Sequence, residues 1–568
     1  MRLELDEVRR LTGPNLLWDH SGAIVDVFIE GIEKDAVLAV WQQWIATLLM
    51  AFEWQPQTTY RLHSEGANLA LRAPMDSLYC ACDLAELAWH CCVAELKNET
   101  MPNWQQRLNE LQDELAEELN PALIRLIDEA HKQGVTCLID DDEVSLGMGQ
   151  SSQTWPAREL PELSDIEWRK YRDIPSVFIT GTNGKSTCVR LASHIAKAAG
   201  FVAGVTSTDF IRVGDEIIDT GDYSGPGGAR MLLRDRRTEL ALLEVARGGI
   251  LRRGIPIGSV DAALITNVAS DHLGQYGINT VEELAEAKFV VAKGLDKQGT
   301  LVLNADNEVV IEQGLKLDNK ICWFSTQESN VLIQSHLKSG GAAVFIRNKQ
   351  IVYALGNEQQ NIASIEQVPM TLNGAAVHNV QNALGVVGLC KALNLSTEAI
   401  RVGLQDFGSN AEDNPGRGNI YEINGIKVLV DFAHNEHSMR AVVKTINQLP
   451  AKRKIVVFSH AGDRSNDEIR SLTHAVTNLD ATLYVVTELE RYLRGRHKGV
   501  ISNIVGNYLQ QQSIHPEKIQ YAAAPLEGAK IAMNFAQSGD VILLFVLADR
   551  EQVHEYLTGC ASQSLLKK

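Results

Sequence analysis

A glycine-rich turn followed by a lysine and two hydroxyl residues is the strongest chemical signal in the sequence. The stretch SVFITGTNGKST, residues 176–187, runs from an apolar segment through this turn into a helical pattern. Turn amides and the helix dipole hold phosphate, a lysine such as Lys185 neutralises its charge, and a hydroxyl such as that of Ser186 ligates magnesium. The stretch therefore predicts a nucleotide triphosphate site, with Ile179 standing where the general phosphate-loop pattern has its first glycine. An ordinary glycine-rich turn, the alternative, has no need of the lysine and serine.

The loop and the motifs after it resemble those of the Mur ligase family, ATP-dependent enzymes that join an amino acid to a carboxylate. After TGTNGKST come LLEVARGGILRRG, TNVASDHLG, ELAEAKFVVAK, HNVQNALG, NPGRGN and VDFAHNEHSM. They follow one another in this order between residue 176 and about residue 550. The resemblance implies activation of a carboxylate as an acyl phosphate, with ATP and Mg²⁺ as cofactors.

The resemblance also implies roles for individual residues. Ser186 and Glu244 hold one magnesium ion between the β- and γ-phosphates, and His272 helps to hold a second ion near the γ-phosphate and the carboxylate. Lys288 matches a position that is carbamylated in many Mur ligases. Its alternative is an exposed helix lysine, and that of His272 is a structural histidine at a strand end. The loop residues expected to bind the nucleotide are Thr182, Asn183, Gly184, Lys185, Ser186 and Thr187.

Three later residues resemble positions that reach the nucleotide after the domains close. Arg417 in NPGRGN steadies the transferring phosphoryl group, Asp431 in VDFAHN binds the ribose, and Asn382 in HNVQNALG lies on the adenine side. For Asp431 the alternative is a turn residue at a strand end. The resemblance thus gives a catalytic set of Lys185, Glu244, His272, Lys288 and Arg417.

The amine substrate is expected to dock on the C-terminal domain. HAGDRSND and RYLRGRHKG are the candidate loops, and the second is also compatible with a solvated surface run of basic residues. Arginines there are suited to an anionic group of the substrate. The candidate substrate residues are His434, Asn435, Asp463, Arg464, Arg494 and Arg496.

Within the Mur ligase family, the branch that this sequence resembles is the cyanophycin synthetases, which build an aspartate backbone and attach arginine to it. The stretches responsible are VRRLTGPNLLWDH, TSTDFIRVGDEIIDTGDYSGPGGA, EVARGGILRRG and RYLRGRHKG. Two features of that branch are missing here. The ATP-grasp domain that adds aspartate is absent between SLGMGQSSQTWPA and DIPSVFITGTNGKST, and ELAWHCC has Glu86 and Trp89 where an H-x-x-E-H hydrolase motif needs His and Glu. Backbone elongation and hydrolysis are therefore not expected.

The length of the chain predicts several domains, because 568 residues are too many for a single hydrophobic core. Shifts in composition along the chain indicate where the domains lie. We predict an α/β protein. Residues 1–150 form an N-terminal accessory domain like that of cyanophycin synthetases, mainly helical or α+β, with helices at 34–52, 82–97 and 104–134. Residues 151–172 form a linker. Residues 173–408 form a central ATP-binding P-loop domain with a parallel sheet, predicted from strands SVFIT, LALLEVA, AALITNVA and GTLVLNA. Residues 409–568 form a Rossmann-like domain, predicted from KVLVDFA, KIVVFSHAG, LYVVTE and DVILLFVLAD.

The composition restricts partners and compartment. A net charge of −18 argues against general binding to nucleic acid or anionic membranes, and no stretch is long and apolar enough to span a bilayer comfortably. Nine cysteines without framework spacing fit a reducing cytoplasm. The group Cys80, Cys82, His90, Cys91 and Cys92 suggests zinc, but small buried thiols on a helix fit the spacing better.

The expected function is ATP-dependent amide-bond formation between an amino acid, with arginine or lysine as the first guess, and a carboxylate of an aspartate-containing or cyanophycin-like peptide. Three alternatives stay open. The same chemistry acts on a different small peptide or metabolite; the chain is a weakly catalytic partner that binds ATP or a polymer beside a separate synthetase; or it is a generic P-loop GTPase or kinase, which leaves the later motifs unexplained. We also expect a homo-oligomer.

Overall fold

A four-stranded antiparallel sheet forms the first part of the computed structural model, which describes residues 1–408 and 410–565. Its strand order is β1-β2-β4-β3. Helices α1 (Lys34–Ala51), α2 (Leu78–Lys97) and α3 (Trp104–Glu118) pack with it around a core that includes the buried Trp41 and Trp89. This region is therefore α+β, one of the two expected descriptions, although its individual strands were not predicted. The strands are β1 (Arg2–Leu11), β2 (Gly22–Glu30), β3 (Thr58–His63) and β4 (Gly66–Arg72).

The predicted helix 104–134 is two helices. The break lies at Asn120 and Pro121, where Pro121 begins α4 (Pro121–Gln133) and the Asn120 side chain caps it by accepting from the Leu123 amide at 3.1 Å. Proline lacks an amide proton and disfavours a helical residue before it, which ends α3.

The predicted linker 151–172 is folded against α4. It contains β7 (Gln153–Pro156), which pairs with β6 (Glu143–Leu146); β6 in turn pairs with β5 (Cys137–Ile139), so the three form a small sheet. Ile166 and Tyr171 are buried in the same core as α4. The segment is an ordered connection, and the domain limits remain predictions; residue 409, where the last domain was set to begin, lies outside the described residues.

The predicted cysteine group lies on α2. Cys80, Cys91 and Cys92 are buried in the N-terminal core, and the thiols of Cys80 and Cys92 donate to backbone carbonyls at 3.5 and 3.6 Å. Burial raises the pKa of both thiols to about 12. The His90 side chain is 53% exposed. The arrangement is that of packed thiols on a helix.

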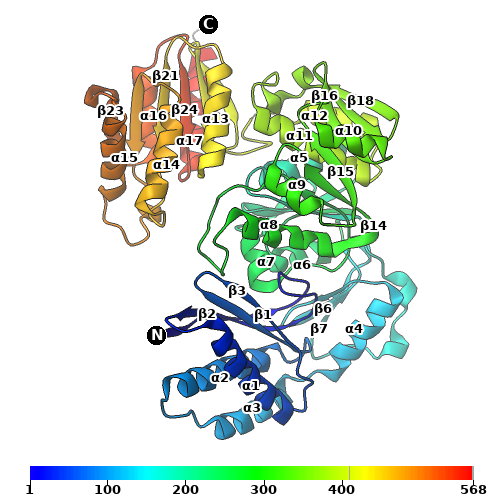
Figure 1. Ribbon diagram of the computed structural model, residues 1–568. Helices are drawn as coiled ribbons and strands as arrows, with labels where there is room; N and C mark the ends of the chain where they lie inside the picture. Colours follow the sequence, from blue (N-terminus) through cyan, green and yellow to red (C-terminus); the bar gives the residue numbers. More distant parts are fainter. Residues whose placement is uncertain (409, 566–568) are drawn as a thin grey trace.

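An eleven-stranded sheet forms the centre of the molecule (Figure 1), with strand order β11-β10-β9-β12-β8-β13-β14-β15-β16-β17-β18. The four predicted strands are its parallel middle: β8 (Ser176–Thr180), β12 (Leu240–Glu244), β13 (Val260–Ile265) and β14 (Leu295–Asn304). Antiparallel hairpins end the sheet on both sides. The other strands are β9 (Ala203–Thr206), β10 (Phe210–Val213), β11 (Glu216–Thr220), β15 (Lys320–Ser325), β16 (Ala342–Arg347), β17 (Gln350–Leu355) and β18 (Glu358–Ser364).

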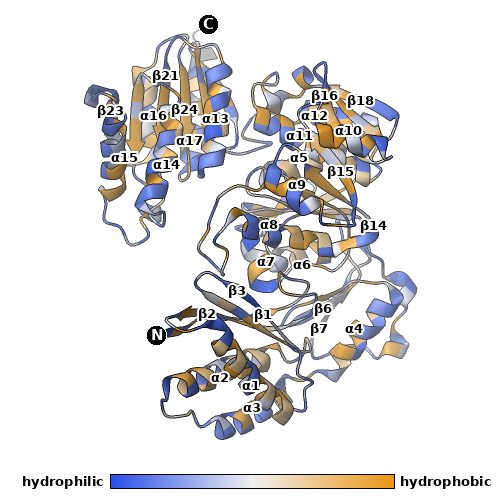
Figure 2. Cartoon of the chain, viewed as in Figure 1, coloured by the Kyte–Doolittle hydropathy of each residue, from blue (hydrophilic) through white to orange (hydrophobic). Residues whose placement is uncertain are grey.

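Both faces of this sheet are covered by helices, so the middle of its central strands is mostly apolar (Figure 2). Along β8, Phe178 enters the core on one face, whereas Val177 and Ile179 enter the core on the other. On the second face lie α5 (Lys185–Ala198), α11 (Val377–Ala392) and α12 (Thr397–Asp406). On the first face lie α6 (Pro226–Arg234), α7 (Arg247–Arg253), α8 (Val281–Phe289), α9 (Glu308–Gly314) and α10 (Val331–Lys338).

A six-stranded sheet of order β19-β20-β24-β21-β22-β23 forms the C-terminal domain. The four predicted strands are confirmed as β20 (Ile426–Asp431), β21 (Lys454–Phe458), β22 (Leu483–Thr487) and β24 (Val541–Phe545), all parallel. The edges are β19 (Asn419–Ile423) and β23 (Ile519–Ala522). One face is covered by α13 (Glu436–Gln448), α14 (Asn466–Thr477) and α15 (Val500–Gln511), and the other by α16 (Pro525–Phe535) and α17 (Arg550–Leu565).

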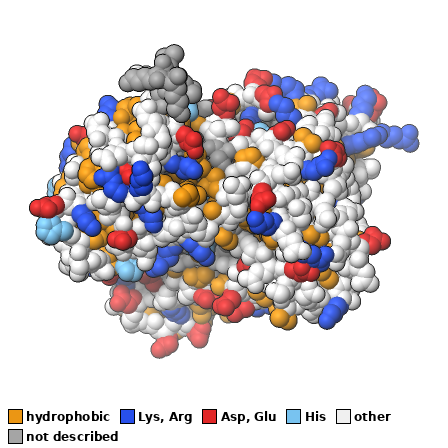
Figure 3. Space-filling view, turned by 90° about the horizontal axis from the view of Figure 1, so that it is seen from above, with side chains coloured by type: hydrophobic (Ala, Val, Ile, Leu, Met, Phe, Trp, Pro, Cys, Tyr) orange, Lys and Arg blue, Asp and Glu red, His pale blue; other side chains and the backbone are white. Residues whose placement is uncertain are grey.

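The surface carries both signs of charge. Seen from above the central and C-terminal domains, basic and acidic side chains are interspersed (Figure 3). Among the described residues, no helix has the length and apolar character needed to cross a bilayer.

The N-terminal sheet is docked on the central domain through its β3–β4 hairpin (Figure 1). Arg61 donates to the Gly277 carbonyl at 2.8 Å and pairs with Glu283 at 2.9 Å. The Asn279 amide nitrogen donates to the Ser64 hydroxyl at 2.8 Å. These contacts hold the loop between β13 and α8, which also carries His272.

We expect Arg61→Ala to loosen this loop, because the variant loses a hydrogen bond and a half-buried ion pair. The expected cost is about 1–2 kcal/mol of unfolding free energy, with faster amide hydrogen exchange across residues 272–283. Arg72→Ala is the matched control, because the Arg72 side chain is exposed and its hydrogen bond is to Gln57 of the same N-terminal region. Unchanged exchange in Arg61→Ala would contradict the docking role.

Candidate active site

A cavity of about 1250 Å³ lies where the carboxyl ends of the central strands face the C-terminal domain. Its walls include the loops after β8, β12 and β13, the start of α11, and the loop after β20. Parallel sheets bind ligands at this edge, because the loops after neighbouring strands converge there. Part of β1 from the N-terminal domain also lines it.

The phosphate loop has the predicted form. Gly184 caps α5 with φ +90°, and a Cβ there would lie 2.2 Å from the Asn382 side-chain oxygen, so only glycine fits. The Lys185 ammonium donates to the Gly181 and Thr182 carbonyls at 3.1 and 3.2 Å, so the side chain folds back over the loop. The loop can therefore bind an anion next to the positive charge of Lys185.

Ser186 and Glu244 form a buried oxygen pair under this loop. The Ser186 hydroxyl donates to Glu244 Oε1 at 3.3 Å, and Glu244 is 2% exposed. Its Oε2 is buried and has no hydrogen-bond partner within the described part of the chain. Burial raises the pKa of the Glu244 carboxyl. An orphaned carboxylate oxygen beside a hydroxyl fits a hard divalent cation such as Mg²⁺.

Lys288 is buried at the same cavity. The residue is 3% exposed, and its ammonium donates to the Gly181 carbonyl at 2.9 Å. Burial, followed by the neighbouring charge of Lys185, lowers the pKa of Lys288 well below its usual value. The alternative of an exposed helix lysine is wrong, and the nitrogen contacts the carbonyl that also binds Lys185.

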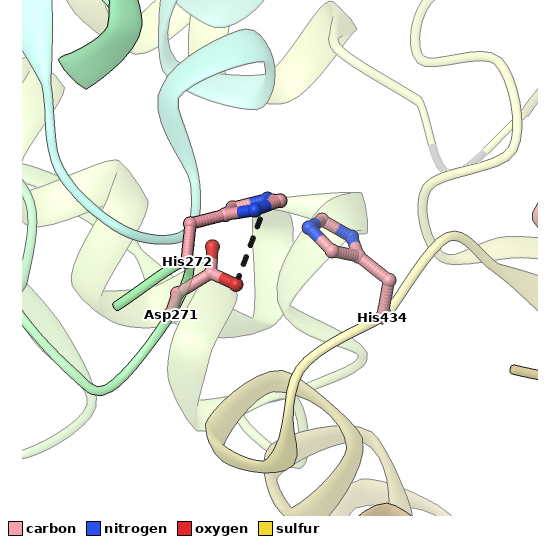
Figure 4. Close-up of side chains that lie close together, drawn as sticks. All are labelled: Asp271, His272 and His434. Carbon is pink, nitrogen blue, oxygen red and sulfur yellow. Dashed lines mark ion pairs between the residues drawn. The ribbon is translucent and has the colours of Figure 1, made fainter. Parts of the chain in front are cut away.

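His272 belongs to a second group that spans two domains (Figure 4). Ligand atoms of Asp271, His272 and His434 all lie within 4.8 Å of one another. His272 comes from the loop after β13 and His434 from the loop after β20, and the two rings point toward each other (Figure 4). His272 is therefore grouped with Asp271 and His434, whereas Ser186 and Glu244 form a pair of their own. Asp271 was not predicted, although it precedes His272 in the quoted motif.

Arg464 ties the C-terminal domain to this group. Its guanidinium donates to Asp271 at 3.2 Å, and its side chain is 12% exposed. Asp463 is exposed on the cavity wall. The neighbouring Arg496 donates to the Gly462 carbonyl at 2.8 Å and the Arg464 carbonyl at 2.5 Å, so it holds the loop in shape. Arg494 is exposed and lies over the Tyr492 ring, outside the cavity lining.

Arg417, a predicted nucleotide residue, and Arg550, which was not predicted, both lie against Phe432. The guanidiniums of Arg417 and Arg550 lie 5.1 and 5.0 Å from its ring centre. Asp431 lines the cavity, accepts from the Ala433 amide at 2.8 Å, and has a pKa that burial raises to about 6. Asn435 caps α13, and its amide nitrogen donates to Asn183 of the phosphate loop at 2.8 Å.

Asp209 connects the central domain to the C-terminal domain, and it was not predicted. Its carboxylate accepts from Arg190 at 2.5 Å and Arg550 at 2.9 Å, and lies 3.8 Å from Arg417. Arg190 is 1% exposed, so its charge depends on this partner. The three cations hold the pKa of Asp209 at about 2, against the effect of burial. TSTDF, which contains Asp209, was quoted only for its family likeness, and Arg550 is 341 residues away.

Comparisons with known proteins agree with this arrangement. A family model for the Mur ligase middle domain matches residues 179–390, and one for the Mur ligase, glutamate ligase domain matches residues 416–545. A cyanophycin synthetase of Nostoc sp. is 35% identical over 338 residues, which are 60% of this chain and 37% of that protein. The chain thus spans less than half of the length of such curated relatives.

Two solved structures share the fold. E. coli FolC in complex with DHPP and ADP has a TM-score of 0.51 at 16% identity, covering 68% of this chain and 89% of that one. A bifunctional folylpolyglutamate synthase/dihydrofolate synthase with Mn, AMPPNP and L-glutamate bound has a TM-score of 0.50 at 18% identity, with the same coverage.

We expect Asp209→Asn to lower the unfolding free energy by about 3 kcal/mol, because buried Arg190 loses its counter-charge. The loss of unfolding free energy relative to wild type is largest above the unfolded carboxyl pKa of about 3.9. It becomes smaller as the pH falls toward 2, the folded pKa of Asp209. Urea unfolding from pH 7 to pH 3 measures it. Asp215→Asn, which removes an exposed partner of Lys197, is the control and should change little. A pH-independent difference would refute the charge role.

Proposed function

The chain belongs to the Mur ligase family, and on that premise we propose that it is an ATP-dependent carboxylate–amine ligase. The bond formed is an amide between an amino acid and a carboxylate of a peptide-like acceptor. The single observation that carries the proposal is the buried Glu244 carboxylate beneath the phosphate loop: its Oε1 accepts from Ser186, and its Oε2 has no hydrogen-bond partner among the described residues. A carboxylate in that setting suits a metal-bound polyphosphate, and a scaffold has no need of it.

The residues fit a reaction in two transfers. An oxygen of the acceptor carboxylate attacks the γ-phosphorus of ATP, the bond to the β-phosphate oxygen breaks, and ADP leaves. The amino group then attacks the acyl carbon, loses a proton, and inorganic phosphate leaves with the former carboxylate oxygen. Lys185 offsets the phosphate charge, and Arg417 approaches the transferring group from the hinge.

Two groups of side chains would hold divalent cations. Ser186 and Glu244 would hold one, while Asp271, His272 and His434 would hold another. Magnesium, when bound, neutralises the phosphate charge and polarises the γ-phosphoryl group. Buried Lys288 lies between the loop and the neighbouring charge of Asp271, and its depressed pKa favours a neutral amine, the form that can be carbamylated.

The substrates proposed first are arginine or lysine and an aspartate-containing, cyanophycin-like peptide. The likeness to a protein named cyanophycin synthetase supports this choice, and the match to about two fifths of that protein limits it to the ligase half. The same chemistry on another small peptide is the second candidate. Homo-oligomerisation and a separate synthetase partner remain predictions.

Phosphate release tests the proposal. Each amino acid is paired with short aspartate peptides in the presence of ATP and magnesium, and mass spectrometry of the acceptor accompanies the assay. We expect turnover only when both substrates are present, with the mass gain of one amide. We expect Lys185→Ala to abolish it, whereas Lys197→Ala, an exposed lysine on the same helix, leaves it unchanged. Equal phosphate release by Lys185→Ala would refute the site.

We expect His272→Ala to lower turnover by orders of magnitude, because the metal group loses a ligand while the phosphate loop stays intact. ATP binding, measured by fluorescence of a labelled analogue, should remain detectable. His131→Ala, an exposed histidine near the end of α4, is the control. Normal turnover in His272→Ala would remove this residue from the reaction.

A further inference from the structure

Three arginines of α7 line one end of the cavity, at the side of the N-terminal domain. They are Arg247, Arg252 and Arg253, all from the EVARGGILRRG motif whose Glu244 lies under the phosphate loop. Arg252 is exposed to the cavity, and the other two are half-buried. The proposed chemistry at the phosphate loop has no step for these three residues.

None of the three has a carboxylate within ion-pair distance among the described residues. Arg247 donates to the His272 carbonyl at 2.7 Å and to the Gln275 side chain at 2.6 Å. Arg252 donates to the Tyr276 hydroxyl at 2.6 Å, and Arg253 donates to the Arg10 carbonyl at 3.1 Å. These hydrogen-bond partners are neutral, and the nearest carboxylates act only from beyond ion-pair distance: Asp271 on Arg247, Glu7 and Asp222 on Arg252, and Asp141 on Arg253. The arginine charges favour an anionic ligand, and guanidinium binds carboxylate with two parallel hydrogen bonds.

The N-terminal domain fixes the position of these arginines. Buried Arg9 donates to the Leu251 carbonyl, and the Thr12 amide donates to the Arg253 carbonyl at 2.9 Å. The Ile255 amide donates to the Pro14 carbonyl at 2.8 Å. At Gly254, with φ +97°, a Cβ would lie 2.6 Å from the Pro14 oxygen, so the two domains meet backbone to backbone. The end of α7 is thus built jointly by the two domains.

Tyr276 completes the wall from the loop that carries His272. The Arg9 guanidinium lies 4.7 Å from its ring centre, and that of Arg252 lies 5.8 Å away. Arg9 is paired with buried Asp26, so its charge is compensated and it serves as support. The arginine wall is therefore ordered before any ligand binds, which lowers the entropic cost of binding.

Two carboxylates also line this end, and neither pairs with the three arginines. Glu7 lies 3.7 Å from Arg9, and Asp222 accepts from the Ser224 hydroxyl at 2.6 Å. Between α6 and α7 the lining is glycine: a Cβ on Gly227 or Gly248 would meet no atom within 4 Å. This open floor leaves room for a peptide main chain beside the arginines.

We propose that Arg247, Arg252 and Arg253 form an acceptor subsite that binds a further carboxylate of the peptide, apart from the carboxylate that is activated. The subsite selects acceptors with more than one carboxylate, and the N-terminal domain contributes by holding α7 in place. This inference rests on the proposed function for its meaning. Its test measures binding without turnover, so a result that refutes the subsite can be told apart from one that refutes the proposed function.

The test is isothermal titration of the full-length protein with tetra-aspartate, and with tetra-asparagine as the neutral match. Magnesium and a non-hydrolysable ATP analogue are present at saturation so that the nucleotide site is occupied. The variants are Arg252→Gln and Arg253→Gln. Arg169→Gln is the control, because Arg169 is exposed, outside the cavity lining, and without an ion-pair partner among the described residues. Thermal melts check that each variant folds, and Arg252→Glu replaces any variant that does not.

We expect tetra-aspartate to bind at least about tenfold more tightly than tetra-asparagine, with an affinity that falls as salt rises. We expect each cavity variant to weaken tetra-aspartate about tenfold or more, while the analogue binds as in wild type and Arg169→Gln changes nothing. Equal binding of the two peptides, or unchanged binding in Arg252→Gln, overturns the subsite. Uridine diphosphate is titrated in the same way, and if it displaces the peptide from the arginines, the carboxylate assignment is overturned. A protein that binds tetra-aspartate but not the ATP analogue keeps the subsite and loses the proposed function.

Discussion

A buried carboxylate with no ion-pair partner among the described residues is the constraint on which the rest of the structure depends. Glu244 ends the central strand β12 beside β8, and one of its oxygens has no partner among the described residues. Burial of such a group is unfavourable unless a cation completes it. The phosphate loop provides the other groups of the cation site, because it brings the Ser186 hydroxyl to the same carboxylate and carries Lys185 beside it. The apolar strands on either side keep the pair dry, which strengthens its attraction for a divalent cation.

The same logic governs the junctions between domains. At the C-terminal junction, Asp209 compensates Arg190 and Arg550 and lies near Arg417, so the charges around the proposed nucleotide site are already held in place. At the N-terminal junction, Arg9 and the Thr12 amide hold the end of α7. The accessory domain thus acts through the shape of the cavity. The three domains meet around one site; the central and C-terminal domains bring positive charge to it, and the N-terminal domain holds the end of α7.

Local patterns in the sequence predicted the phosphate loop and four parallel strands in each of the two large sheets, because each rests on an apolar run and neighbouring turn residues. The individual strands of the N-terminal sheet were not predicted, although an α+β domain was among the expectations, because strongly helical patterns dominate residues 1–150. Asp209 and Arg550 were missed because their pairing spans 341 residues, and no local pattern records such a contact. Asp271 stood in a quoted motif, but only the fold shows that it lies with His272 and His434. The prediction of one helix over residues 104–134 was wrong, because it followed hydrophobic periodicity and did not take account of Pro121, where a new helix begins.

Transfer of ¹⁸O from the acceptor carboxylate to the released phosphate is the most direct measurement of acyl-phosphate formation. The acceptor is labelled in both carboxylate oxygens, turnover is run with ATP, magnesium and the amino acid, and the phosphate is analysed by mass spectrometry. Formation of an acyl phosphate predicts one ¹⁸O atom in each phosphate released, and one left in the amide. Phosphate without label, formed at the same rate as the amide, would contradict it.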